Sequence, residues 1–151
     1  MTAFIIYDSF ALACRANVLL QNVAENVSGS FVWNVLPWRT QILRFNPTGQ
    51  MALREARDAH LLVFAWEDQR PLHSWMANWL ESWAACRTIP EAAIAVVREG
   101  NQHTEALPEL SRFAARHGIG MILSERNIPE FRISAPVLIS KLMDHGSPLI
   151  A

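Results

Sequence analysis

Short, continuously apolar segments alternate along this chain with longer segments in which apolar and polar residues are mixed. Runs of four to eight apolar residues that are rich in β-branched and aromatic side chains are typical of strands. Because these runs do not alternate with polar residues, they favour parallel strands that are buried on both faces. Five such runs are present: Phe4–Tyr7, Phe31–Leu36, Leu61–Trp66, Ala92–Val97 and Met121–Leu123.

Between these runs, apolar residues recur at spacings of three and four, which predicts helices. The predicted helices are Phe10–Val27, Gln50–Ala59, Leu72–Arg87, Pro108–His117 and Ser134–His145. Because a helix follows each strand, we expect a parallel sheet with helices on both faces. Its predicted strand order is 2-1-3-4-5 in a single domain, residues 1–151, with the most continuously apolar run, Leu61–Trp66, in the centre.

The sequence also predicts where one strand ends and where irregular links lie. The second strand is expected to stop at Pro37, because proline cannot donate a hydrogen bond to a neighbouring strand. The segments Arg39–Phe45 and Asn127–Ser134 show no clear period and are interpreted as irregular links.

Acidic residues follow four of the five predicted strands. In an open α/β sheet, ligands bind in the crevice at the carboxyl ends of the strands, so these residues could line one crevice. Clustered carboxylates could bind a divalent cation or share a proton, or they could simply be solvated at loop tips. No spacing matches a metal-binding loop, so no metal site is predicted. The candidate crevice residues are Asp8, Ser9, Glu67, Asp68, Glu99 and Glu125.

Signatures of catalysis are missing from the sequence. No G-x-S-x-G segment is present, and the histidines show no zinc-binding spacing. The one lysine, Lys141, lies in the last predicted helix, far from any strand end, which argues against a P-loop or a Schiff-base lysine. We therefore predict no catalytic residues and favour a domain that is not an enzyme.

One predicted helix, Leu72–Arg87, carries an unusually wide apolar face. Its tryptophans recur every fourth residue and spread over roughly 80° around a helix of 3.6 residues per turn. The face could pack on the sheet, stack on a flat ligand, or form a two-fold interface between two copies of the chain. We expect a homodimer through this helix. The candidate interface residues are Leu72, Trp75, Met76, Trp79 and Trp83.

The composition and charge of the chain argue against further classes of partner. The net charge of −1 provides no field that favours nucleic acid or an anionic membrane surface, and neither partner is expected. No apolar run approaches the roughly 20 residues that span a bilayer. The amino terminus shows no signal-peptide pattern, and Cys14 and Cys86 are interpreted as reduced thiols. Both observations lead us to expect a cytoplasmic location.

The opening segment, Phe4–Ala11, resembles the start of a response-regulator receiver, in which a strand ends at acidic metal-binding residues. Of that acidic pair only Asp8 matches. The receiver's phosphoacceptor would fall near Ala65 or Trp66, its hydroxyl residue near Arg98, and its lysine near Ser124 or Glu125, and none of the three is present. The resemblance therefore implies a degenerate receiver that is not phosphorylated.

The segments Asp58–Phe64 and Trp75–Glu81 are similar to the middle of flavodoxin-type reductases, which implies flavin mononucleotide (FMN) as a cofactor. However, Asp8–Ala11 lacks the hydroxyl- and glycine-rich loop that holds the flavin phosphate. Both resemblances imply a three-layer α/β/α flavodoxin-like fold, as in uncharacterised bacterial proteins. We expect a non-catalytic binding, signalling or scaffold module without a cofactor and with an unidentified small-molecule ligand. The alternative is an atypical flavin- or nucleotide-linked oxidoreductase.

Overall fold

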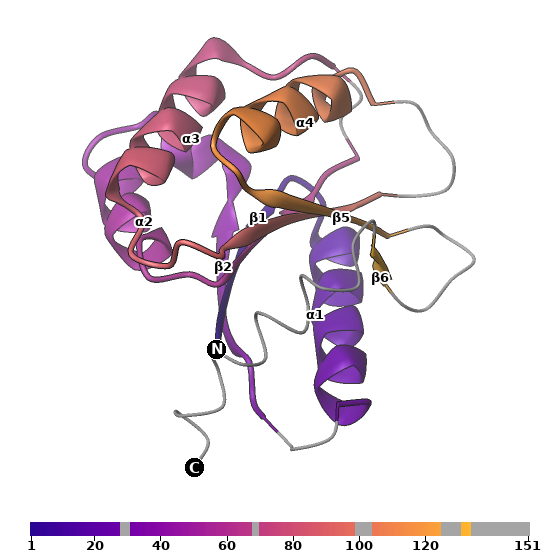
Figure 1. The fold of residues 1–151 in the computed structure, drawn as a ribbon. Helices are drawn as coiled ribbons and strands as arrows, with labels where there is room; N and C mark the ends of the chain where they lie inside the picture. Colours follow the sequence, from indigo (N-terminus) through magenta and orange to yellow (C-terminus); the bar gives the residue numbers. More distant parts are fainter. Residues whose placement is uncertain (28–30, 68–69, 99–103, 125–130, 134–151) are drawn as a thin grey trace.

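The computed structural model describes residues 1–27, 31–67, 70–98, 104–124 and 131–133. Five parallel strands run in the order β2-β1-β3-β4-β5, which confirms the predicted flavodoxin-like topology (Figure 1). A sixth strand, β6, adds to β5 in the antiparallel direction. The strands are β1 (Thr2–Tyr7), β2 (Asn34–Arg39), β3 (Leu61–Ala65), β4 (Ala93–Val97), β5 (Gly120–Ser124) and β6 (Phe131–Ile133).

The centre of the sheet is where the apolar pattern predicts it. All five residues of β3 are buried, and β3 pairs with β1 on one side and with β4 on the other. All five residues of β4 are buried as well. Strands covered on both faces have no solvent side, so polar residues are excluded from them.

The two edges of the sheet differ from the sequence-based expectation. The strand β2 begins later than predicted and continues through Pro37, which lies opposite Ile5 of β1. Proline is tolerated there because, among the described strands, β2 is an edge strand that pairs with β1. The missing N–H therefore need not break hydrogen bonding to a second strand. The strand β6 lies within the segment that was interpreted as irregular.

Helices cover both faces of the sheet and make three layers (Figure 1). Buried residues of α2, α3 and α4 share one core cluster with Phe4 and Phe64, and α1 packs on the opposite face. The predicted helix Ser134–His145 lies outside the described residues. The helices are α1 (Phe10–Glu25), the 3-10 helix η1 (Thr40–Arg44), α2 (Thr48–Ala56), α3 (Ser74–Cys86) and α4 (Ala106–Arg116).

Two of the three tryptophans on α3 belong to the core. Trp79 is 7% exposed and Trp83 is 0% exposed. Their indole N–H groups donate to backbone carbonyls of α2, from Trp79 to Gly49 at 3.1 Å and from Trp83 to Ala56 at 2.9 Å. A buried indole needs such a partner for its N–H. The tryptophan face therefore joins α3 to α2 as well as to the sheet, and Trp75 alone of the three is partly exposed.

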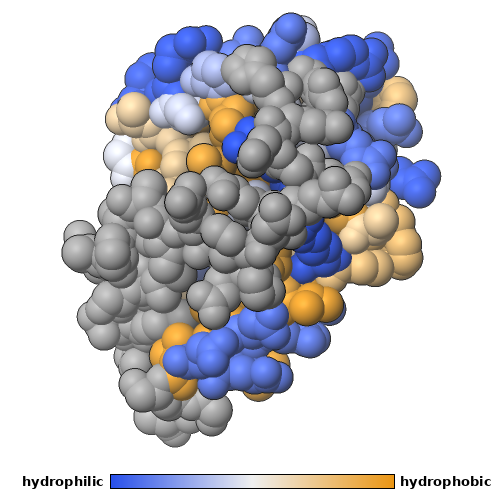
Figure 2. Space-filling view, turned by 90° about the vertical axis from the view of Figure 1, so that its right-hand side faces the viewer, coloured by the Kyte–Doolittle hydropathy of each residue, from blue (hydrophilic) through white to orange (hydrophobic). Residues whose placement is uncertain are grey.

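The surface is mixed in polarity. Figure 2 shows one side of the molecule, where hydrophobic residues lie among hydrophilic ones. None of the helices in the described ranges combines the length and the apolarity needed to cross a bilayer. Several large apolar side chains are nevertheless exposed, and three of them, Ile42, Phe45 and Met51, lie in or near η1 and α2.

Candidate functional site

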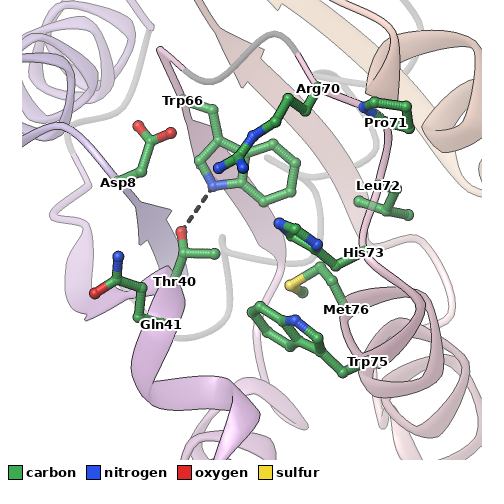
Figure 3. A pocket seen from close by; sticks show the side chains of 10 residues that line it. All are labelled: Asp8, Thr40, Gln41, Trp66, Arg70, Pro71, Leu72, His73, Trp75 and Met76. Atoms are coloured by element: carbon green, nitrogen blue, oxygen red, sulfur yellow. Dashed lines mark hydrogen bonds between the residues drawn. The ribbon is translucent and has the colours of Figure 1, made fainter.

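A cavity of about 100 Å³ opens at the carboxyl ends of β1 and β3 (Figure 3). Within the sheet, β1 lies between β2 and β3: the chain passes from β1 to β2 on one side of β1, and β3 lies on the other side of β1. The cavity therefore lies where the strand order reverses, the usual ligand position in an open α/β sheet. Its lining residues come from the ends of β1 and β3, from η1 and from the start of α3: Asp8, Thr40, Gln41, Trp66, Arg70, Pro71, Leu72, His73, Trp75 and Met76.

Trp66 forms one wall of the cavity directly after β3. Its indole N–H donates to the hydroxyl oxygen of Thr40 at 2.8 Å. Its ring also meets Phe64 edge-on, with centroids 4.7 Å apart and an interplanar angle of 62°. A hydrogen bond on one edge and an aromatic contact on another fix the plane of this indole, so it presents a preformed flat surface.

The opposite wall comes from the start of α3. The rings of His73 and Trp75 are stacked, with centroids 5.7 Å apart and planes within 12° of each other. Met76 lines the cavity as well and is buried. The N–H of Leu72 donates to a carboxylate oxygen of Glu109 at 2.6 Å, which ties the segment before α3 to α4. This wall is thus held by its neighbours before any ligand binds.

A second, shallower hollow of about 480 Å³ adjoins the cavity and shares Gln41, His73 and Trp75 with it. It also includes Phe45, which is 58% exposed, and Arg44. The guanidinium of Arg44 lies 5.9 Å from the centroid of the Phe45 ring. We call the cavity and this hollow together the aromatic groove, because Trp66, His73, Trp75 and Phe45 line it.

Three of the predicted crevice residues do converge at the end of β3. The backbone N–H of Glu67 donates to Asp8 Oδ1 at 2.8 Å, and the Ser9 hydroxyl donates to Glu67 Oε1 at 3.1 Å. The Ser9 oxygen also accepts from the N–H of Leu12 at 3.3 Å and so caps α1. These contacts fasten the β1–α1 turn to the end of β3, and Asp8 alone of the three lines the cavity.

The other predicted crevice residues, Asp68, Glu99 and Glu125, lie outside the described residues. Within the part of the chain that is described, no group of three or more histidine, cysteine or acidic residues is arranged to hold a metal ion. Of the predicted interface residues, Leu72, Trp75 and Met76 line the cavity, whereas Trp79 and Trp83 lie in the core.

Sequence reasoning missed most of the groove. Thr40 and Gln41 follow β2, but the apolar run that predicts this strand ends at Leu36, before the strand itself ends at Arg39. The two residues therefore do not stand at the predicted strand end. Trp66 was assigned to the third strand, although the strand ends at Ala65. No pattern in the sequence marks Phe45 and His73 as site residues, because they line the same hollow only through the packing of η1 against α3.

The fold defines the class of this protein as a flavodoxin-like α/β domain. Neither a protein-family model nor a curated protein sequence matches the chain. The observations that bear on its function therefore come from the groove, since the same fold serves many different activities in different proteins.

Proposed function

We propose that this chain is a non-catalytic, flavodoxin-like binding module that holds a small, flat ligand in the aromatic groove. The observation that carries the proposal is the position of two adjoining hollows, walled by aromatic rings, at the point where the strand order reverses. Concave sites with mostly apolar and aromatic linings and a few polar groups are the usual form of small-molecule sites.

The polar contacts in the groove support binding rather than catalysis. Thr40 accepts the hydrogen bond that orients Trp66, and Asp8 accepts one that holds Glu67. His73 stacks on Trp75. In these contacts the side chains fix the walls of the groove, which is the role that a binding site requires of them.

Neutral indole is a suitable first probe, because it is flat and can stack on Trp66 and Trp75. We expect indole, titrated into ¹⁵N-labelled protein, to shift the indole N–H signals of Trp66 and Trp75 in a saturable way. The same signals of Trp79 and Trp83 should not move, because those rings are buried and bonded to α2. The two core tryptophans are therefore internal controls.

Two results would contradict the proposal. The first is the absence of any saturable shift at millimolar indole. The second is a purified protein with the visible absorption bands of a flavin, which would favour the alternative, a flavin-linked oxidoreductase.

The homodimer expected from the sequence stays a prediction, and it now depends on the start of α3. Trp79 and Trp83 are buried, so Trp75 is the one tryptophan of α3 that a second copy could contact, together with the exposed Ile42 and Phe45. We expect Trp75→Glu to give a folded monomer in light scattering, because a charge would replace the centre of the apolar contact.

The matched control for this variant is Ser82→Glu, which adds the same charge at an exposed position of α3. It should leave the dimer intact. A wild-type protein that is already monomeric at high micromolar concentration would contradict the dimer. It would leave the aromatic groove open to a ligand, because Trp75 and Phe45 line the groove and would otherwise lie in the contact between the two copies.

A further inference from the structure

We infer that the ligand of the aromatic groove is a small aromatic carboxylate, with the edge of its ring in the cavity beside Trp66 and its carboxylate in the outer hollow beside Arg44. This inference rests on the proposed function and adds the chemical class of the ligand. Three features of the groove carry it: the size of the cavity, the signs of the charges along the groove, and the surface that Arg44 and Phe45 form together.

The size of the cavity limits the ring system. A cavity of about 150 Å³ can hold one benzene ring. The cavity beside Trp66 measures about 100 Å³ and opens into the outer hollow. The cavity is smaller than such a benzene site, so only the edge of a ring can enter it beside Trp66 and Met76. The remainder of the ligand must lie in the outer hollow of about 480 Å³.

The charges along the groove favour an anion at its outer end. Arg44 is the one arginine among the described residues that line the outer hollow, which include no lysine, aspartate or glutamate, and Arg70 lines the cavity. The one carboxylate among the described lining residues is Asp8, at the inner end, where it accepts the N–H of Glu67. At the inner end, the charges of Asp8 and Arg70 offset each other, whereas no acidic side chain stands among the described residues that line the outer hollow with Arg44. A ligand with its ring inward and its negative charge outward would thus approach Arg44 and avoid Asp8.

The chemistry of Arg44 selects a carboxylate. A guanidinium can donate two parallel hydrogen bonds to the two oxygens of a carboxylate. The Arg44 guanidinium lies 5.9 Å from the centroid of Phe45, so cation and ring form one surface at the rim. The same fork can also bind a phosphate, but Arg44 is the one arginine among the described residues of the outer hollow and balances a single negative charge. That charge matches a carboxylate and leaves a doubly charged phosphate half balanced.

Three probes with the same ring separate charge from shape: indole-3-acetate, neutral indole and cationic tryptamine. We expect indole-3-acetate to bind about fivefold more tightly than indole in an NMR or calorimetric titration at low salt, and tryptamine to bind least tightly. Raising the salt concentration should reduce the advantage of the anion, since an exposed charge contact is screened.

Two variants test where the carboxylate of the ligand lies. Arg44→Gln should reduce the affinity for indole-3-acetate to about that for indole. Arg112→Gln is the matched control, because Arg112 is exposed on α4 and lines a separate groove between α3 and α4. It should leave the affinity for all three probes as in the wild type.

The outcomes distinguish this inference from the proposed function. Equal affinity for the three probes, or tightest binding of tryptamine, would overturn the carboxylate and leave the binding module standing. A preference for the anion that survives Arg44→Gln would overturn the assigned position of the carboxylate. If none of the probes binds, the proposed function fails, and the inference fails with it.

Discussion

Trp83→Ala is expected to lower the free energy of unfolding by about 4 kcal/mol, the middle of the range for removing a large buried aromatic side chain. The Trp83 indole is 0% exposed and packs in the core cluster of α2, α3, α4 and the sheet. Its N–H donates to the carbonyl of Ala56, which would lose this donor in the variant. Chemical denaturation at neutral pH measures the difference, provided that the slope with denaturant is unchanged.

Two further variants separate the contributions to this effect. Trp83→Phe keeps a ring but removes the N–H, so we expect a smaller loss of about 1–2 kcal/mol, which includes the lost hydrogen bond to Ala56. Trp75→Ala removes the same side chain from a partly exposed position of the same helix and should cost less than Trp83→Ala. A loss below about 1.5 kcal/mol for Trp83→Ala would be inconsistent with a core position for this indole.

Gly49→Ala is expected to destabilise the protein by about 2 kcal/mol, although it replaces a helical glycine. At an ordinary helical position this substitution stabilises by roughly 0.5–1 kcal/mol. At Gly49, however, an added Cβ would overlap the backbone carbonyl oxygen of Leu43 in η1. The Gly49 N–H also donates to the carbonyl of Phe45 at 2.6 Å, so the start of α2 cannot easily move away from η1.

The neighbouring variant Gln50→Ala is the control for Gly49→Ala. Gln50 is exposed on the same turn of α2, so its replacement should change the free energy of unfolding by less than about 0.5 kcal/mol. Thermal or chemical unfolding of both variants is sufficient. A Gly49→Ala protein that is more stable than the wild type would show that η1 and α2 do not pack as described.

The sequence was sufficient for the central part of the sheet. The strands β3 and β4 are apolar at every position because both of their faces are covered. Such a pattern can be recognised in the sequence without knowing which elements pack against the strands. The edge strand β2 has three exposed residues, Asn34, Pro37 and Arg39, so its apolar pattern is weaker and the sequence does not mark its boundaries. The strand β6 has three residues, too few for a periodic signal.

The candidate site was predicted in part. Asp8, Ser9 and Glu67 do meet, because the carboxyl ends of β1 and β3 lie side by side in a parallel sheet. The aromatic walls were not predicted, because η1 has no periodic signature and its packing against α3 is a tertiary effect. Likewise, a spacing of four shows that Trp75, Trp79 and Trp83 share one side of a helix, but not which part of that side α2 covers.

The two indole bonds from α3 to α2 have an evolutionary consequence. Trp79 and Trp83 bind the carbonyl oxygens of Gly49 and Ala56, which every residue type supplies. Side chains on the outer surface of α2, such as Met51, can therefore change without loss of the acceptors that hold the helix. A lineage carrying this fold could vary that surface, and the rim of the groove at Phe45, toward new ligands while the two tryptophans stay constant.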